Sequence, residues 1–142
     1  MKDFMSSTFK ASFRVSWAET DAAQIVHFSN YFRFFERTEE ELYRHLSFNF
    51  NDVMGKHNIF LPRVEAFCQF KKPARFNDLL EVELRVKEIK EKSIRYGFKI
   101  FNKESTVLLA NGYIVIVAVD RETGKATAIP MEITEKLKQF YC

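Results

Sequence analysis

The segment from Trp17 to Leu46 constrains the fold of this chain more than any other. Beyond Ser29, a residue type that commonly caps helices, mainly apolar side chains recur at steps of three and four residues. This stripe contains Tyr31, Phe35, Thr38, Leu42 and Leu46, and the charged positions between them are Arg33, Arg37, Glu40 and Arg44. The spacing predicts one long amphipathic helix, preceded by a polar loop that carries the acid Asp21.

On both sides of this helix the period of the pattern drops to two, which is typical of half-buried strands. Residues 9–17 alternate strictly between apolar and polar side chains, so a strand is expected to run through Trp17. Residues 79–89 and 93–101 alternate in the same way. Their short connection predicts an antiparallel hairpin.

The remaining segments show weaker patterns. Residues 47–58 predict a mobile connection with a short helical turn, and residues 59–70 predict one more strand. Residues 106–119 are apolar on both faces, as expected of a central strand covered on both sides. After Pro130, a short helix is expected to bury Ile133, Leu137 and Phe140.

The order of these elements is strand, long helix, four strands and short helix. It predicts a single α+β domain over residues 1–142, in which one long helix packs on a five-stranded antiparallel sheet. Sixteen phenylalanines are more than a monomer of 142 residues needs, which favours a subunit interface or an apolar ligand pocket. A second copy of the chain is the simplest cover for the outer sheet face.

Charge and cysteine content exclude several classes of function. The net charge of +3 is only mildly basic, and basic residues alternate with acids, which favours an anionic small molecule over nucleic acid.

The two cysteines have no metal-binding or disulfide spacing, so a reducing, cytoplasmic location is expected. His45 and His57 lack partners that would suggest a metal. No signal peptide or membrane-spanning apolar run is present, so no membrane insertion is expected.

Asp21 is the residue that most directly suggests chemistry. The first amides of a helix lack intrahelical partners and lie at the positive end of its dipole, so Asp21 can share a site with hydrogen-bond donors. A carboxylate beside an oxyanion stabiliser suggests acyl chemistry. The alternative is a loop carboxylate that caps the next turn.

The run TDAAQIVHFSNYFRFFE resembles the signature of the hotdog-fold thioesterases of the 4-hydroxybenzoyl-CoA thioesterase type. The matching positions are Asp21, Val26, Asn30, Tyr31, Phe34, Phe35 and Glu36. The stretch PARFNDLLEV from Pro73 to Val82 resembles the family's segment before its third strand. The resemblance covers the chain from about Phe9 to Phe140. It implies the hotdog fold, in which a curved sheet wraps the long helix.

The resemblance implies hydrolysis of an acyl-CoA thioester. It further implies a dimer in which two sheets join edge to edge, with the active site at the boundary between the two subunits. A dimer of dimers is a further implied state. Asp21 matches the family's catalytic carboxylate, which acts as nucleophile or general base, and Phe28 matches the residue whose backbone amide polarises the thioester carbonyl. Glu36 matches the catalytic acid of a second branch, and His27 is a candidate for tuning proton transfer. The positions implied for contact with the CoA phosphates are Lys90 and Lys92, and further candidates by charge alone are Lys71, Lys72 and Arg75. No metal or redox cofactor is expected, since CoA enters as part of the substrate.

Two positions differ from the family pattern. Gln24 replaces a glycine three residues after the acid, at a place that favours glycine's torsional freedom, and His27 stands where Tyr or Trp is common. Two other functions stay open at this point. A hotdog hydratase or dehydratase would need a cooperating Asp and His, and only His27 stands near Asp21; a noncatalytic acyl-CoA binding module would keep the pocket alone.

Overall fold

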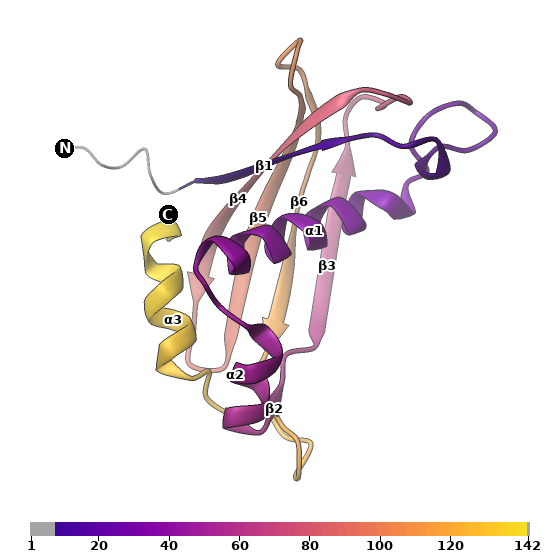
Figure 1. Ribbon diagram of the computed structural model, residues 1–142. Helices are drawn as coiled ribbons and strands as arrows, with labels where there is room; N and C mark the ends of the chain where they lie inside the picture. The colour runs from indigo at the N-terminus through magenta and orange to yellow at the C-terminus, as the bar shows by residue number, and fades with distance from the viewer. Residues whose placement is uncertain (1–7, 142) are drawn as a thin grey trace.

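The computed structural model describes residues 8–141 and contains one five-stranded antiparallel sheet in the order β1-β4-β5-β6-β3 (Figure 1). Its strands are β1 (Phe9–Arg14), β3 (Arg63–Phe70), β4 (Leu79–Ile89), β5 (Ser93–Asn102) and β6 (Leu108–Val117). The predicted α+β architecture with a five-stranded sheet is therefore confirmed. The observed bounds of β4 and β5 agree with the expected hairpin, because both strands alternate between buried and more exposed side chains over most of their length.

The long helix α1 (Ser29–His45) lies against one face of the sheet (Figure 1). Its apolar stripe is buried, as predicted, against the inward side chains of the strands. Phe35 of α1 stacks on Phe98 of β5 with the ring centroids 4.4 Å apart, and both residues belong to one continuous core. Burial of this stripe stabilises the helix on the sheet far more than helix propensity does.

The entry into α1 differs from the sequence-based expectation. β1 ends at Arg14, and Trp17 begins a 3-10 turn (Trp17–Glu19) in which the Ser16 amide donates to Glu19 Oε1 at 2.7 Å. Trp17 is consequently 80% exposed, and the prediction of a strand through this residue was wrong. The residue that caps α1 is Phe28, so Ser29 is the first helical residue and not the cap.

Within residues 47–58, where a mobile connection with a short helical turn was expected, the chain forms a helix of eight residues, α2 (Phe50–His57). The side chain of Asn49 caps it by accepting from the Asp52 amide at 3.1 Å. The strand expected over 59–70 is divided at Leu61–Pro62 into β2 (Ile59–Phe60) and β3. β2 pairs with β7 (Val119–Asp120) in a small separate sheet.

β6 is an interior strand with a neighbour on each side, as its apolar sequence predicted. β5 occupies the centre, and β6 lies between β5 and the edge strand β3. The inward residues of β6 are buried under α1, whereas the outward ones are only partly covered. Most of β3 is exposed on both faces, including Val64, Phe67 and Phe70. The described part of the chain thus leaves one sheet edge unpaired and partly apolar.

A buried polar cluster connects α1 to this edge strand. Glu39 of α1 accepts hydrogen bonds from the Tyr43 hydroxyl at 2.5 Å and from Arg63 Nη2 at 2.6 Å. The Tyr96 hydroxyl of β5 lies 2.9 Å from that of Tyr43. Burial raises the pKa of Glu39 above its ordinary value of 4.5, and the positive charge of Arg63 offsets only part of this shift.

The helix α3 (Met131–Leu137) follows Pro130 as predicted and, with the turn after it, buries Ile133, Leu137 and Phe140. Glu132 of α3 lies 2.5 Å from His57 Nε2, which joins α3 to α2. Of the helices within residues 8–141, none is both long and apolar enough to cross a membrane.

Candidate active site

A tight loop places Asp21 immediately before α1. The Asp21 amide donates to the Ile25 carbonyl at 3.0 Å, and the Gln24 amide donates to the Asp21 carbonyl at 2.8 Å. One carboxylate oxygen of Asp21 accepts from the Ala23 amide at 2.8 Å. Gln24 adopts φ 68°, so the position at which the sequence departs from glycine does hold the left-handed conformation. These bonds fix the backbone of Asp21 and engage one of its oxygens.

The loop is anchored to neighbouring elements on both sides. The Val26 amide donates to the Ala74 carbonyl at 2.8 Å, and the His27 amide donates to the Glu19 carbonyl at 2.9 Å. Asn30 Nδ2 of α1 donates to the same Glu19 carbonyl at 2.8 Å. The start of α1 is thereby tied to the 3-10 turn and to the segment after β3.

The Phe28 amide stands apart from those around it. The amides of residues 26, 27, 29, 30 and 31 all donate hydrogen bonds, to carbonyls or to the His27 ring. Within the part of the chain that the structure describes, the Phe28 amide has no acceptor. It lies at the N-terminus of α1, where the helix dipole favours negative charge. This N–H is therefore available to a ligand oxygen.

Asp21 and Phe28 line the same cavity, which has a volume of about 440 Å³. The other residues around it are Ile25, Val26, Tyr31, Phe70, Lys71, Lys72 and Pro73. Tyr31 meets Phe70 edge to face with the centroids 5.0 Å apart, and burial raises the pKa of Tyr31, so its phenol stays neutral. The cavity thus combines an acid, an available amide, an aromatic wall and two cationic residues.

The predicted cationic residues are divided between the two ends of the sheet. Lys71 and Lys72 line the cavity, and Arg75 pairs with Ile25 of the Asp21 loop through a backbone bridge. Lys90 and Lys92 lie in the β4–β5 hairpin, beside Ser93 and Val117. The register of the sheet places this hairpin at the end opposite Phe70, so one chain does not bring it to Asp21.

Glu36 and His27 lie outside the cavity that contains Asp21. Glu36 is exposed on α1 beside a separate hollow of about 180 Å³. His27 Nδ1 lies 2.8 Å from Ser29 Oγ, and the imidazole packs on the Phe28 ring with the centroids 4.6 Å apart. His27 therefore supports the position of the helix start and does not face Asp21 across the cavity.

Tyr31 and Phe70 are cavity residues that sequence reasoning placed in other roles. Tyr31 was expected in the buried stripe of the helix and Phe70 on a strand face. Both lie at ends of elements beside the Asp21 loop, and this position in the chain is the signal that could have indicated a cavity wall. Residues 8–141 contain no group of three acidic, His or Cys side chains arranged to hold a metal ion.

The geometry suits chemistry at a carbonyl. A carbonyl oxygen placed against the Phe28 amide gains stabilisation as negative charge develops on it, and a carboxylate in the same cavity can attack or deprotonate. One long helix against a five-stranded antiparallel sheet, with such a site at the start of the helix, defines the hotdog class of α+β folds. The chain belongs to the thioesterase-like superfamily, whose family model matches residues 15–137.

Individual relatives agree with this assignment. The acyl-CoA thioester hydrolase YbgC of Escherichia coli is 30% identical over 134 residues, which cover 94% of this chain and 98% of the relative. A hypothetical protein from Aquifex aeolicus of known crystal structure is 32% identical, with a TM-score of 0.82 and coverage of 91% and 98%. A 1,4-dihydroxy-2-naphthoyl-CoA thioesterase from Synechocystis has a TM-score of 0.88 at 23% identity, covering 92% and 96%, and shows likeness of fold.

Proposed function

We propose that this protein is an acyl-CoA thioesterase, which hydrolyses an acyl-CoA thioester to the free acid and CoA. The observation that carries the proposal is the pairing of the Asp21 carboxylate with the acceptor-free Phe28 amide in one cavity of the described chain. Relatives with this activity, such as YbgC, align over nearly the whole chain.

The reaction follows from these two groups. The thioester oxygen accepts a hydrogen bond from the Phe28 amide, which polarises the carbonyl carbon. Asp21 then either attacks that carbon, so that the C–S bond breaks and water later cleaves the acyl-aspartate anhydride, or takes a proton from a water molecule that attacks. In both routes CoA leaves as the thiolate and the acyl group leaves as the carboxylate.

The structure favours hydrolysis over the hydratase alternative. A hydratase of this fold needs an Asp and a His that act together, but His27 is engaged with Ser29 and lies outside the cavity. Among the residues described, no histidine lines the cavity with Asp21. Glu36 is the reserve candidate for the catalytic acid.

We further propose a homodimer joined through β3, because the outer edge of this strand has no partner within residues 8–141 and the strand exposes Val64 and Phe70. Antiparallel pairing of two β3 strands would bring the hairpin end of the second copy toward the Asp21 end of the first. This arrangement would bring Lys90 and Lys92 of one copy toward CoA at the cavity of the other, while Lys71, Lys72 and Arg75 would act from the same chain as the cavity. A dimer of dimers is the further state we propose.

The finer assignment that we propose is the 4-hydroxybenzoyl-CoA thioesterase type, on the basis of the Asp21 to Glu36 motif. The location we propose is the cytoplasm: Cys68 forms no disulfide within residues 8–141, and burial raises the pKa of its thiol to about 11, which keeps it protonated and unreactive.

The experiment is a panel of acyl-CoA thioesters, with aryl, branched and straight acyl groups, and detection of the free thiol. Release of CoA with at least one member is expected. Hydration of an enoyl-CoA without thiol release would show a hydratase, and saturable binding of acyl-CoA without turnover would show a binding module. Either result would overturn the proposal.

A further inference from the structure

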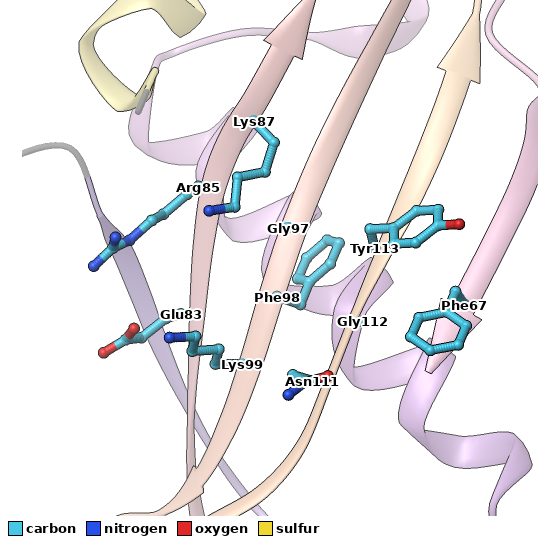
Figure 2. A pocket seen from close by; sticks show the side chains of 10 residues that line it. All are labelled: Phe67, Glu83, Arg85, Lys87, Gly97, Phe98, Lys99, Asn111, Gly112 and Tyr113. Atoms are coloured by element: carbon cyan, nitrogen blue, oxygen red, sulfur yellow. The ribbon is translucent and has the colours of Figure 1, made fainter. Parts of the chain in front are cut away.

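A second cavity lies on the sheet face that points away from α1 (Figure 2). Its volume is about 220 Å³, and strands β3 to β6 form its floor and walls. Aromatic rings from β3 and β6 stand on one side, and charged side chains from β4 and β5 stand on the other (Figure 2). The residues that line it are Phe67, Glu83, Arg85, Lys87, Gly97, Phe98, Lys99, Asn111, Gly112 and Tyr113. We refer to this cavity as the outer groove.

Gly97 opens the outer groove. The sheet register aligns Arg85, Gly97, Tyr113 and Phe67 in one row across four strands, and Gly97 contributes no side chain to that row. A Cβ atom at this position would lie 2.9 Å from the Lys87 side chain, which extends across the glycine. Any larger residue would displace Lys87 and fill the space between the rings and the cations.

Two stacked rings form the aromatic side of the groove. Phe67 and Tyr113 stack with their centroids 5.5 Å apart and their planes 27° apart. The Arg95 guanidinium lies 4.1 Å from the Tyr113 centroid, and the Tyr113 hydroxyl donates to Glu65, so the tyrosine is held in place. Phe67 stays 45% exposed. Because Arg95 covers Tyr113 and Phe67 stacks on the same ring, the aromatic surface left open to a planar base is that of Phe67.

The opposite side carries excess positive charge. Glu83, the acid within the groove, lies 3.9 Å from Lys10 of β1, and Glu65 is engaged by Tyr113. Within residues 8–141, neither Lys87 nor Lys99 forms an ion pair with a carboxylate. Two such ammonium groups on one side of a groove favour a ligand with more than one negative charge, such as a phosphate-bearing molecule.

We propose that the outer groove binds an adenine nucleotide, with the base stacked on Phe67 and the phosphates against Lys87 and Lys99. An adenine nucleotide that binds the groove can come from two sources. One is the 3′-phosphorylated ADP end of acyl-CoA; this source rests on the proposed thioesterase function and would place the nucleotide in the outer groove in place of a contact with Lys90 and Lys92. The other is a free nucleotide that binds independently of the substrate.

The first test is binding of adenosine 3′,5′-bisphosphate to the full chain by calorimetry. The wild type is expected to bind saturably, and the double variant Lys87→Gln, Lys99→Gln to bind at least about tenfold more weakly, because the charges are lost while the stems remain. The matched control is Lys125→Gln, Lys138→Gln, which removes the same charge from residues outside the groove and is expected to bind like the wild type. Absence of binding by the wild type, or equal loss in both double variants, would overturn the proposal.

The base is tested separately. Phe67→Leu is expected to weaken binding of adenosine 3′,5′-bisphosphate but not of inorganic pyrophosphate, because the leucine removes the stacking surface and leaves the lysines. Equal effects on both ligands would contradict stacking in the groove. Neither binding measurement depends on turnover, so a failure of the proposed thioesterase function would be seen independently.

Steady-state kinetics distinguish between the two sources of the bound nucleotide. If the nucleotide belongs to the substrate, the groove double variant raises KM for acyl-CoA while kcat, and turnover of an acyl-N-acetylcysteamine thioester that lacks the nucleotide, stay unchanged. If the ligand is a free nucleotide, the same variant loses bisphosphate binding and keeps the KM for acyl-CoA.

Discussion

Gln24 holds a backbone conformation that glycine adopts more readily, and this conformation shapes the loop around Asp21. The left-handed turn at Gln24 lets its amide reach the Asp21 carbonyl, while the next residue returns the chain toward α1. A non-glycine residue at positive φ costs roughly 1 kcal/mol, and the surrounding hydrogen bonds offset that cost. The sequence identified this position through its departure from the motif, but only the structure showed that the conformation itself is retained.

The effect of a substitution at Gln24 on the free energy of unfolding should depend on how well the new residue tolerates positive φ. Gln24→Val is expected to lower the free energy of unfolding by about 1 kcal/mol, because a β-branched residue tolerates positive φ worst. Gln24→Gly is expected to leave it nearly unchanged, since relief of strain and greater freedom of the unfolded chain oppose each other. Urea denaturation measures the free energy of unfolding of both variants. A valine variant as stable as the wild type would show that the left-handed turn is not strained.

At the scale of elements, hydrophobic period determined what could be predicted. β4 and β5 were predicted closely because each has one fully buried face and a second face that is less covered. The strand predicted through Trp17 failed because alternation continues past Arg14 while the backbone turns into the 3-10 segment. α2 was expected only as a short helical turn, because a helix of eight residues with a single buried side chain leaves almost no apolar stripe to detect.

The connection between α1 and β3 had no signal in the sequence at all. Glu39 begins a run of three glutamates, a pattern typical of a solvated helix face, yet it is buried and bonded to Arg63 and Tyr43. These partners lie 24 and 4 residues away, and only the packing of α1 on the sheet brings the cluster together. Such pairings depend on tertiary geometry, which no local pattern records.

Glu39→Gln tests this connection. The variant is expected to lower the free energy of unfolding at pH 7 by roughly 1.5–3 kcal/mol, because the charge-assisted bond to Arg63 is lost. The raised pKa of Glu39 means that the folded state binds more protons than the unfolded state in the range above 4.5. The contribution of this group to stability is therefore greatest below that range and is lost as the pH rises through the folded pKa.

The stability of the wild type relative to Glu39→Gln should consequently increase as the pH falls from 7 toward 4. Denaturation curves of both proteins at several pH values measure the difference directly. A difference that shrinks on acidification would show that the charge of Arg63 outweighs burial and holds the pKa of Glu39 below its ordinary value.

At the scale of the whole molecule, the exposed edge at β3 and the site at the start of α1 are neighbours. Phe70 at the end of β3 lines the Asp21 cavity, while Ala66 of the same strand lies beside the hollow that contains Glu36. A second copy paired along β3 would cover both places. The abundance of phenylalanine suggested an interface, and the strand order is the observation behind our proposal that it lies at β3.

Ala66→Arg tests the proposed dimer. In a single chain the long side chain can extend into solvent from an exposed edge, so the fold should be retained. In the dimer the same side chain would add bulk at the seam between the two β3 strands, so light scattering should show the mass of one chain where the wild type shows two or more. Ala66→Ser serves as the control. A dimeric arginine variant would show that β3 does not form the interface.

The catalytic proposal depends most directly on Asp21. Asp21→Asn keeps an oxygen that can accept from the Ala23 amide, so the loop should be preserved while the negative charge is removed. We predict that kcat/KM for the best acyl-CoA substrate falls by about 10²- to 10⁴-fold, with the mass of the assembly unchanged. A variant that keeps most of the wild-type rate would contradict the assignment and would make Glu36 the next residue to replace.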